Sequence, residues 1–239
     1  MKNQNRINTK SAIDRVFNSM HGVNLYGMEL THEEINKNTH RSIVGGAWDK
    51  FKKLQCDFLV SNGLKPSHKL LDIACGCMRG GMSCIKYLDP GNYYGFDVNR
   101  SLVKAGKIEI EKAGLKDKNP HLLVSDSFQI NKFDMQFDFM VSVSLFTHLP
   151  MNNIIRCLSA VRDSLKPDGV YYSTFWEAPS PAYLKNIRFS EGVITNYDSD
   201  PFHYSFDELK WMADISGLQA TLIGDWGHPR NQKMIAFKH

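Results

Sequence analysis

The 239-residue sequence has no apolar run approaching the roughly 20 residues that a membrane-spanning helix needs. Its first residues are polar and lack the apolar core of a secretory signal peptide, so we expect a cytoplasmic protein. Lysine and arginine nowhere form a basic block, and the formal net charge is only +4. We therefore expect neither a membrane nor nucleic acid as a partner.

Cysteine is also scarce, with five residues whose spacing matches no zinc-binding pattern. Cys75, Cys77 and Cys84 lie close together in the sequence, which leaves two interpretations open. They either hold a metal ion or pack as reduced thiols around a turn. The second is favoured because a free thiol behaves as a small apolar side chain, so no metal site is predicted.

Hydrophobic residues make up 42% of the chain, enough for a sizeable core. The length suits one α/β domain with an added segment rather than two full domains. We assign residues 1–66 to an amino-terminal helical segment that acts as a lid, and residues 67–239 to the main domain. Residues 178–204 contain three prolines among interleaved aromatic and charged residues, and we interpret them as a substrate-cap insertion.

The stretch LLDIACGCMRGG, residues 70–81, contains the main functional motif. Residues 70–75 form an apolar run broken by one acid, Asp72, as in a buried strand. Small residues follow, and a helical pattern begins at Gly81. A strand, a tight turn and a helix form the opening unit of a nucleotide-binding α/β domain, where the helix presents free N–H groups to a ligand.

Further strand and helix patterns alternate after this motif. The second strand pattern, Asn92–Asp97, ends in an acid that can accept hydrogen bonds from both ribose hydroxyls of an adenosine. Other strand patterns cover residues 121–125 and 137–144 and begin again near residue 170, with helical patterns over 99–114 and 151–165. This alternation predicts a parallel sheet with right-handed crossovers. A capping box at residues 205–208 predicts the last helix, and residues 218–223 and 233–237 predict a closing pair of strands.

Together these blocks resemble the class I S-adenosylmethionine-dependent methyltransferases over about residues 63–239. The resemblance implies a Rossmann-like methyltransferase fold, an α/β structure with a doubly wound, mostly parallel seven-stranded sheet and an antiparallel last strand. It also implies S-adenosyl-L-methionine as the cofactor. The family's usual first and third loop glycines align here with Ala74 and Met78, while Gly80 and Gly81 offer room slightly later.

The resemblance also assigns the cofactor-binding residues. In the family, the first loop lies along the methionine part, the second-strand acid holds the ribose, residues after the third strand flank the adenine, and the turn after the fourth strand faces the reacting methyl. The matching positions are Asp72, Ala74, Cys75, Gly76, Arg79, Gly80, Asp97, Val98, Asn99, Asp126, Ser127, Phe128, Ser142, Val143 and Ser144. In the family, a helical segment before the first strand often covers the cofactor. Trp48 is therefore included among the cofactor-binding candidates, and His40, Gly45 and Gly46 are further lid candidates. Alternatively, Trp48 only docks the helix of residues 47–61 onto the sheet.

His148 is the leading candidate for a general base, because it follows the fourth strand and imidazole titrates near neutral pH. The alternative is that His148 contacts the cofactor or caps the next helix. His228, in the connection between the last two strands, is the second catalytic candidate. Substrate-binding candidates come from this connection and from the end of the insertion: His203, Tyr204, Asp225, Trp226 and Arg230.

The function expected from these features is methyl transfer to a small molecule or glycan, with O-methylation and a histidine base preferred. N-methylation of a small molecule and a non-catalytic S-adenosylmethionine-binding protein are the alternatives. A nicotinamide-dependent oxidoreductase is disfavoured because residues 74–79 lack G-x-G-x-x-G. A nucleic-acid base methyltransferase is disfavoured because SVSLF, residues 142–146, replaces the Asn/Asp-Pro-Pro-aromatic motif. The sequence indicates neither the acceptor's identity nor an oligomeric state.

Overall fold

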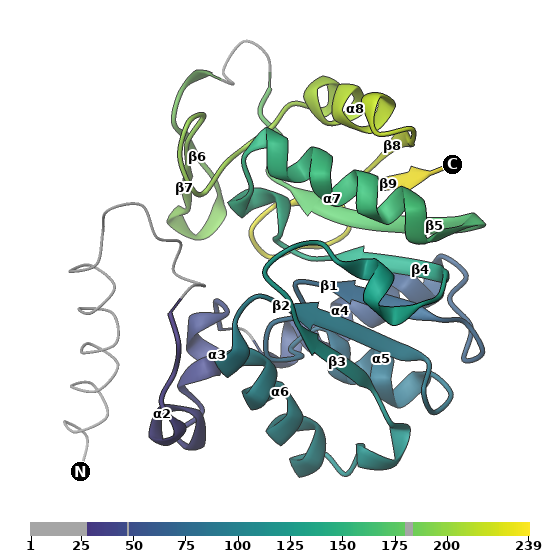
Figure 1. The fold of residues 1–239 in the computed structure, drawn as a ribbon. Coiled ribbons are helices and arrows are strands. Elements are labelled where there is room, and N and C mark those ends of the chain that lie inside the picture. Colours follow the sequence, from purple (N-terminus) through teal and green to yellow (C-terminus); the bar gives the residue numbers. More distant parts are fainter. Residues whose placement is uncertain (1–27, 47, 180–183) are drawn as a thin grey trace, which may run out of the picture.

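The computed structural model describes residues 28–46, 48–179 and 184–239 (Figure 1). Within these residues a seven-stranded sheet has the strand order β3-β2-β1-β4-β5-β9-β8. Strand β9 runs antiparallel to both of its neighbours, and the pairs from β3 to β5 are parallel. The expected mostly parallel sheet with an antiparallel last strand is therefore confirmed. The strands are β1 Leu70–Ile73, β2 Tyr93–Asp97, β3 His121–Val124, β4 Phe137–Ser142, β5 Leu165–Phe175, β8 Gln219–Gly224 and β9 Lys233–Lys238.

Helices cover both faces of this sheet. The helices on the faces are α4 Trp48–Ser61, α5 Gly81–Tyr87, α6 Arg100–Lys112, α7 Met151–Ser164 and α8 Phe206–Ile215, whereas the short helices α2 His32–Asn36 and α3 Thr39–Ile43 pack against α6. Leu71 and Ile73 point to the core that α7 and α8 cover, whereas Leu70 points to the core that α4 and α5 cover. This alternation follows from the two-residue period of a strand. Helix α4, assigned from the sequence to the amino-terminal segment, thus packs directly on the sheet.

Local sequence explains where two of these helices begin. Thr31 and Glu34 form a capping box at the start of α2, and Ser205 and Glu208 form another at the start of α8. In each, the hydroxyl and the carboxylate satisfy backbone N–H groups that the first helical turn leaves unbonded. The start of α8 was expected from the sequence and is confirmed.

The insertion of residues 178–204 contains more regular structure than its sequence predicts. Strand β6, Ile187–Arg188, pairs with β7, Ile194–Thr195, in a small antiparallel hairpin. Single bridges also join Glu177 to Tyr204 and Asn196 to Phe202. Tyr204, at the end of the insertion, exchanges backbone hydrogen bonds with Trp176 and Ala178, which directly follow β5. These bonds hold the end of the insertion against the main sheet.

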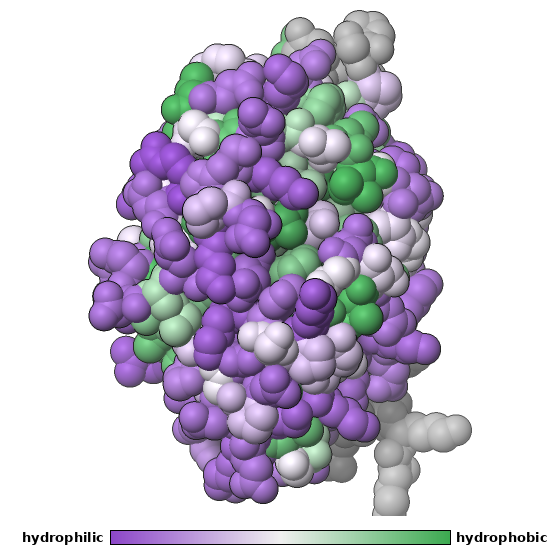
Figure 2. Space-filling model, turned by 90° about the vertical axis from the view of Figure 1, so that its right-hand side faces the viewer, coloured by the Kyte–Doolittle hydropathy of each residue, from purple (hydrophilic) through white to green (hydrophobic). Residues whose placement is uncertain are grey.

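The parallel strands all end on the side of the molecule that carries α3, β6 and β7, opposite the carboxyl end of β9 (Figure 1). Figure 2 shows the other side, where these strands begin, and its surface is mainly hydrophilic with scattered apolar groups. Among the described residues, no helix is long and apolar enough to cross a membrane. In open α/β sheets ligands bind outside the carboxyl ends of the strands. The candidate site is therefore expected on the side where the parallel strands end, near α3, β6 and β7.

Candidate active site

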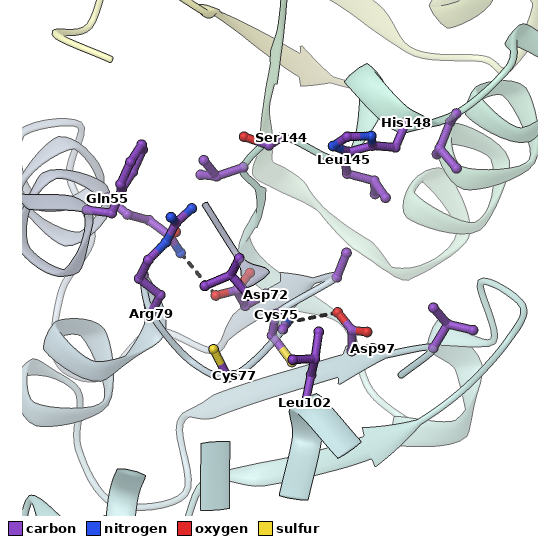
Figure 3. Close-up of a pocket in the computed structure, with 18 residues that line it drawn as sticks. Gln55, Asp72, Cys75, Cys77, Arg79, Asp97, Leu102, Ser144, Leu145 and His148 are labelled. Carbon is purple, nitrogen blue, oxygen red and sulfur yellow. Dashed lines mark hydrogen bonds between the residues drawn. The ribbon is translucent and has the colours of Figure 1, made fainter. Parts of the chain in front are cut away.

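A cavity opens at the carboxyl ends of β1, β2 and β4 (Figure 3). It encloses about 980 Å³ of space, part of which is open to solvent. Its walls come from the loops after these three strands, from α4, and from Val44 just after α3. The wall residues fall within four segments that are far apart in the sequence, residues 44–55, 72–80, 97–102 and 143–149.

The loop after β1 adopts the left-handed backbone that glycines usually provide. Ala74, Gly76 and Met78 have φ angles of 60°, 54° and 66°. The two non-glycine residues bear a strain of the order of 1 kcal/mol each. The Met78 side chain is fully buried and packs against Gly106 of α6, where a Cβ atom would come within 2.8 Å of Met78 Cγ. Gly106 therefore provides the room that the methionine needs, and the Met78 side chain does not line the cavity.

Asp72 is a buried carboxylate on the cavity wall. Its Oδ2 accepts hydrogen bonds from Gln55 Nε2 at 3.0 Å and from the Tyr93 hydroxyl at 2.8 Å. Burial raises the pKa of Asp72 to about 6, although these two hydrogen bonds act in the opposite direction. Gly80 and Gly81 are required beside these donors, because a Cβ atom would lie 1.9 Å from Gln55 Oε1 and 2.1 Å from the Tyr93 oxygen.

Asp97, at the end of β2, joins two walls of the cavity. Its carboxylate accepts hydrogen bonds from the N–H groups of Gly76 and Asn99, each at 2.8 Å. Burial raises the pKa of Asp97, and the backbone hydrogen bonds counteract part of this effect. The carboxylate therefore holds the loop after β1 in place while it also faces the cavity (Figure 3).

The opposite wall is formed by the turn after β4, which carries Ser144, Leu145 and His148 (Figure 3). Ser144 has a left-handed backbone with φ of 65°, its N–H donates to Thr174 Oγ1, and its hydroxyl donates to Gln232 Oε1. His148 ends a short 3₁₀ helix, and its Nδ1 lies 2.5 Å from Asp200 Oδ1. A titratable imidazole thus faces Asp72 and Asp97 across the cavity.

Residues 70–169 match a family model described as a methyltransferase domain. This match covers every strand and turn that builds the cavity wall after α4. The chain therefore contains a methyltransferase domain, and its fold is that of the class I S-adenosylmethionine-dependent methyltransferases. A curated relative of this methyltransferase, a sterol 24-C-methyltransferase from Gibberella zeae, is 28% identical over 138 residues. That alignment covers 57% of this chain and 35% of the relative, so the chain matches about a third of the relative's length.

Solved structures show the same fold for this methyltransferase. An S-adenosylmethionine-dependent methyltransferase from Clostridium acetobutylicum superposes with a TM-score of 0.63 at 12% identity, over 87% of this chain and 98% of that one. Magnesium protoporphyrin IX methyltransferase from Synechocystis, solved with bound cofactor, gives 0.57 at 13% identity over 97% of both chains. At such low identities the likeness establishes the fold alone.

The cavity fits S-adenosylmethionine, the cofactor bound in the Synechocystis structure. Asp97 places a carboxylate at the end of the second strand, where the family binds ribose hydroxyls. The backbone of Ala74 and Gly76 lines the cavity with little side-chain bulk. Val98 and Leu102 provide apolar surface beside Asp97, which suits a flat aromatic base.

The structure brings eleven of the predicted site residues onto the cavity wall. They are Asp72, Ala74, Cys75, Gly76, Arg79, Gly80, Asp97, Val98, Val143, Ser144 and His148. Of the remaining cofactor candidates, Asn99 caps α6, and Ser142 is buried between Tyr171 and Ser173. Asp126, Ser127 and Phe128 follow β3 but are not among the residues that line the cavity.

Trp48 lies away from the cavity lining, against α3. Its ring lies under the guanidinium of Arg41 at 4.7 Å and against the ring of His40. Arg41 and His40 in turn bind the same buried carboxylate, Glu109 of α6. These contacts dock the amino-terminal segment onto α6, so Trp48 does not contact the cavity directly.

The candidates from the last connection and the insertion are also not among the residues that line the cavity. His228 is buried against Phe51 and Trp226, and burial lowers its pKa to about 3. A buried imidazole held neutral in this way is poorly suited to act as a proton acceptor at the cavity. The other candidates bind protein groups: His203 to Thr195, Tyr204 to Leu149, Asp225 to Gly227, Trp226 to Gln232, and Arg230 to Gly45 and Glu191.

The sequence did not indicate five residues of the wall: Val44, Phe51, Gln55, Leu102 and Leu149. Cys77 and Leu145 also line it, within the two loops that the resemblance assigned to the cofactor. Phe51 and Gln55 lie one turn apart on the apolar face of α4, which the sequence pattern identifies as a packed face. The guanidinium of Arg79 stacks on Phe51 at 4.0 Å and donates to the Gly46 carbonyl. That contact could not be inferred from spacing, because it joins the loop after β1 to the amino-terminal segment.

Proposed function

We propose that this methyltransferase transfers the methyl group of S-adenosylmethionine to a hydroxyl group of a small molecule, with His148 as the general base. The observation that carries the proposal is the position of His148 on the cavity wall opposite Asp72 and Asp97 (Figure 3). The named acceptors of the relatives, a sterol and magnesium protoporphyrin IX, are small molecules and support a small-molecule acceptor; the sterol enzyme is named for transfer to carbon, so these names do not bear on the choice of a hydroxyl.

Several residues of the wall would hold the cofactor. Asp97 is placed to accept the ribose hydroxyls, and the loop from Ala74 to Gly80 to follow the methionine part. When bound, S-adenosylmethionine supplies the electrophilic methyl group, and the electron pair of the broken carbon–sulfur bond stays on sulfur. Asp72 adds a negative charge beside this loop, where it favours a cationic ligand.

His148 would accept the proton of the acceptor hydroxyl as its oxygen bonds to the methyl carbon. A hydroxyl is a weak acid, so a correctly placed base accelerates the transfer by typically about 10²–10⁴-fold. Val44, Phe51, Leu145 and Leu149 provide the apolar part of the wall and would limit the access of water. An amine acceptor already has a lone pair and would depend far less on His148.

The amino-terminal segment and the insertion act as lid and substrate cap in this proposal. Val44 contributes to the wall, and the carbonyls of Gly45 and Gly46 accept hydrogen bonds from Arg230 and Arg79. Arg230 also binds Glu191 of the insertion. These contacts connect the segment before α4, the insertion and the last hairpin to one another.

The test uses cofactor carrying a ¹³C-labelled methyl group and a panel of matched acceptors, in which each phenol, alcohol or sugar has an amine counterpart. Mass spectrometry and the ¹³C shift distinguish O-methyl from N-methyl products. We expect O-methyl product from the hydroxyl members, with His148→Ala slowing transfer by about 10²–10⁴-fold. The control is His32→Ala, an exposed histidine of α2 that does not line the cavity. Transfer to amines alone, or an unaffected His148→Ala enzyme, would refute the proposal.

A further inference from the structure

Three successive residues of the turn after β4 are each bound by a different residue of the insertion. The N–H of Phe202 donates to the Thr147 carbonyl at 2.7 Å, and the hydroxyl of Tyr204 donates to the Leu149 carbonyl at 2.5 Å. Between these two bonds, Asp200 Oδ1 lies 2.5 Å from His148 Nδ1. The insertion is thus attached to the turn on both sides of the histidine.

This attachment distinguishes the His148–Asp200 pair from an ordinary surface ion pair. Exposed pairs of flexible side chains contribute little, because holding them together costs entropy. Here the side chains are only 19% and 31% exposed, and Thr147 and Tyr204 beside them are buried. The flanking hydrogen bonds fix the backbone on which Asp200 is carried, so little additional ordering is needed to place its carboxylate.

The chemistry of the pair determines which nitrogen carries the proton. An ionised carboxylate can only accept hydrogen bonds, so the neutral imidazole beside it must donate from Nδ1. The unprotonated nitrogen is then Nε2, at the end of the ring that points toward the cavity in Figure 3. The carboxylate also stabilises the imidazolium that forms when Nε2 accepts a proton.

We propose that Asp200 is a positioning residue that holds His148 in the Nδ1–H tautomer and orients its Nε2 toward the acceptor hydroxyl. The inference rests on the proposed function, because it assigns to the insertion a part in the action of the His148 base. Asp200 does not touch the substrate in this role. The substrate cap therefore supplies half of a histidine–carboxylate pair as well as covering the cavity.

The first experiment needs no acceptor. The ¹⁵N resonances of the His148 ring are recorded in the complex with S-adenosylhomocysteine, for the wild type and for the Asp200→Asn and Asp200→Ala variants. The matched control is Asp198→Asn, which removes one exposed carboxylate from the same loop. We expect a protonated Nδ1 and an unprotonated Nε2 in the wild type and the control, and a mixture of tautomers in both Asp200 variants. A wild-type ring protonated on Nε2, or unchanged resonances in the Asp200 variants, would overturn the inference.

The second experiment measures transfer to the hydroxyl acceptor that yields O-methyl product in the labelled-cofactor panel. Asp200→Asn should lower kcat by about 10²–10⁴-fold, because a wrongly protonated histidine cannot accept the proton. KM and the affinity for S-adenosylhomocysteine should stay within about twofold, which shows that the fold is intact. If His148→Ala is slow but Asp200→Asn is as fast as Asp198→Asn, the proposed function stands and this inference fails. If His148→Ala is also as fast as the wild type, the proposed function itself fails.

Discussion

Replacing Asp72 by asparagine should stabilise the fold at neutral pH. The carboxylate is 4% exposed, and its pKa is raised from 3.8 to about 6, chiefly by burial. A difference of this size corresponds to about 3 kcal/mol between the charged and neutral forms. Asparagine has nearly the same shape, and its carbonyl oxygen can accept the hydrogen bonds from Gln55 and Tyr93. The substitution therefore removes the cost of burying a charge and keeps its partners.

The size of this effect depends on pH. Between about pH 4 and 6 the folded protein holds a proton on Asp72 that the unfolded chain has released, so wild-type stability falls as the pH rises through this range. The asparagine variant lacks this loss. Its advantage should be close to zero at about pH 4 and should approach about 3 kcal/mol above pH 7.

Urea unfolding at a series of pH values measures the difference in free energy. Asp117→Asn, at an exposed carboxylate, is the control and should show no comparable dependence on pH. The reasoning would be refuted if Asp72→Asn changed stability by the same amount at every pH, or destabilised the fold above pH 7. The variant should also bind S-adenosylmethionine more weakly than S-adenosylhomocysteine, relative to wild type, because only the former carries a positive sulfonium charge that the Asp72 carboxylate would stabilise.

Three other substitutions or measurements test separate parts of the structure. Asp97→Ala should weaken the binding of S-adenosylhomocysteine, measured by calorimetry, by roughly 1.5–3 kcal/mol for each ribose hydrogen bond that is lost. Asp126→Ala is the control, because Asp126 is not among the residues that line the cavity, and it should have little effect. Equal losses of binding free energy in the two variants would contradict the geometry. Gly106→Ala should lower the free energy of unfolding by about 1–3 kcal/mol, because the new Cβ atom would clash with Met78. Adding Met78→Ala to the same chain should recover part of this loss, and simply additive losses would contradict the packing. Hydrogen exchange over residues 184–204 should slow when cofactor and acceptor are both bound, and equal protection in the free protein would mean that the segment is a fixed part of the fold.

Much of the architecture follows from local sequence. The capping boxes at Thr31 and Ser205 define helix starts within four residues, and the strand patterns alternate over a few residues only. Because parallel strands end at one edge of the sheet, the residues just after them must gather there. This is why Asp72, Asp97 and His148 could be assigned to one cavity before any contact was known.

Tertiary structure alone decided the contacts between distant segments. Asp200 lies 52 residues from His148, in a stretch with no regular period from which its direction could be predicted. Gln55 reaches Asp72 because α4 packs beside α5 on the same sheet face, and Gly106 makes room for a methionine in a loop that usually carries glycine. Periodicity reports which face of an element is buried, but the partner on that face depends on how the elements pack together. The sequence therefore determined the sheet and the edge that carries the site, whereas the packing of the insertion determined that Asp200 lies beside His148.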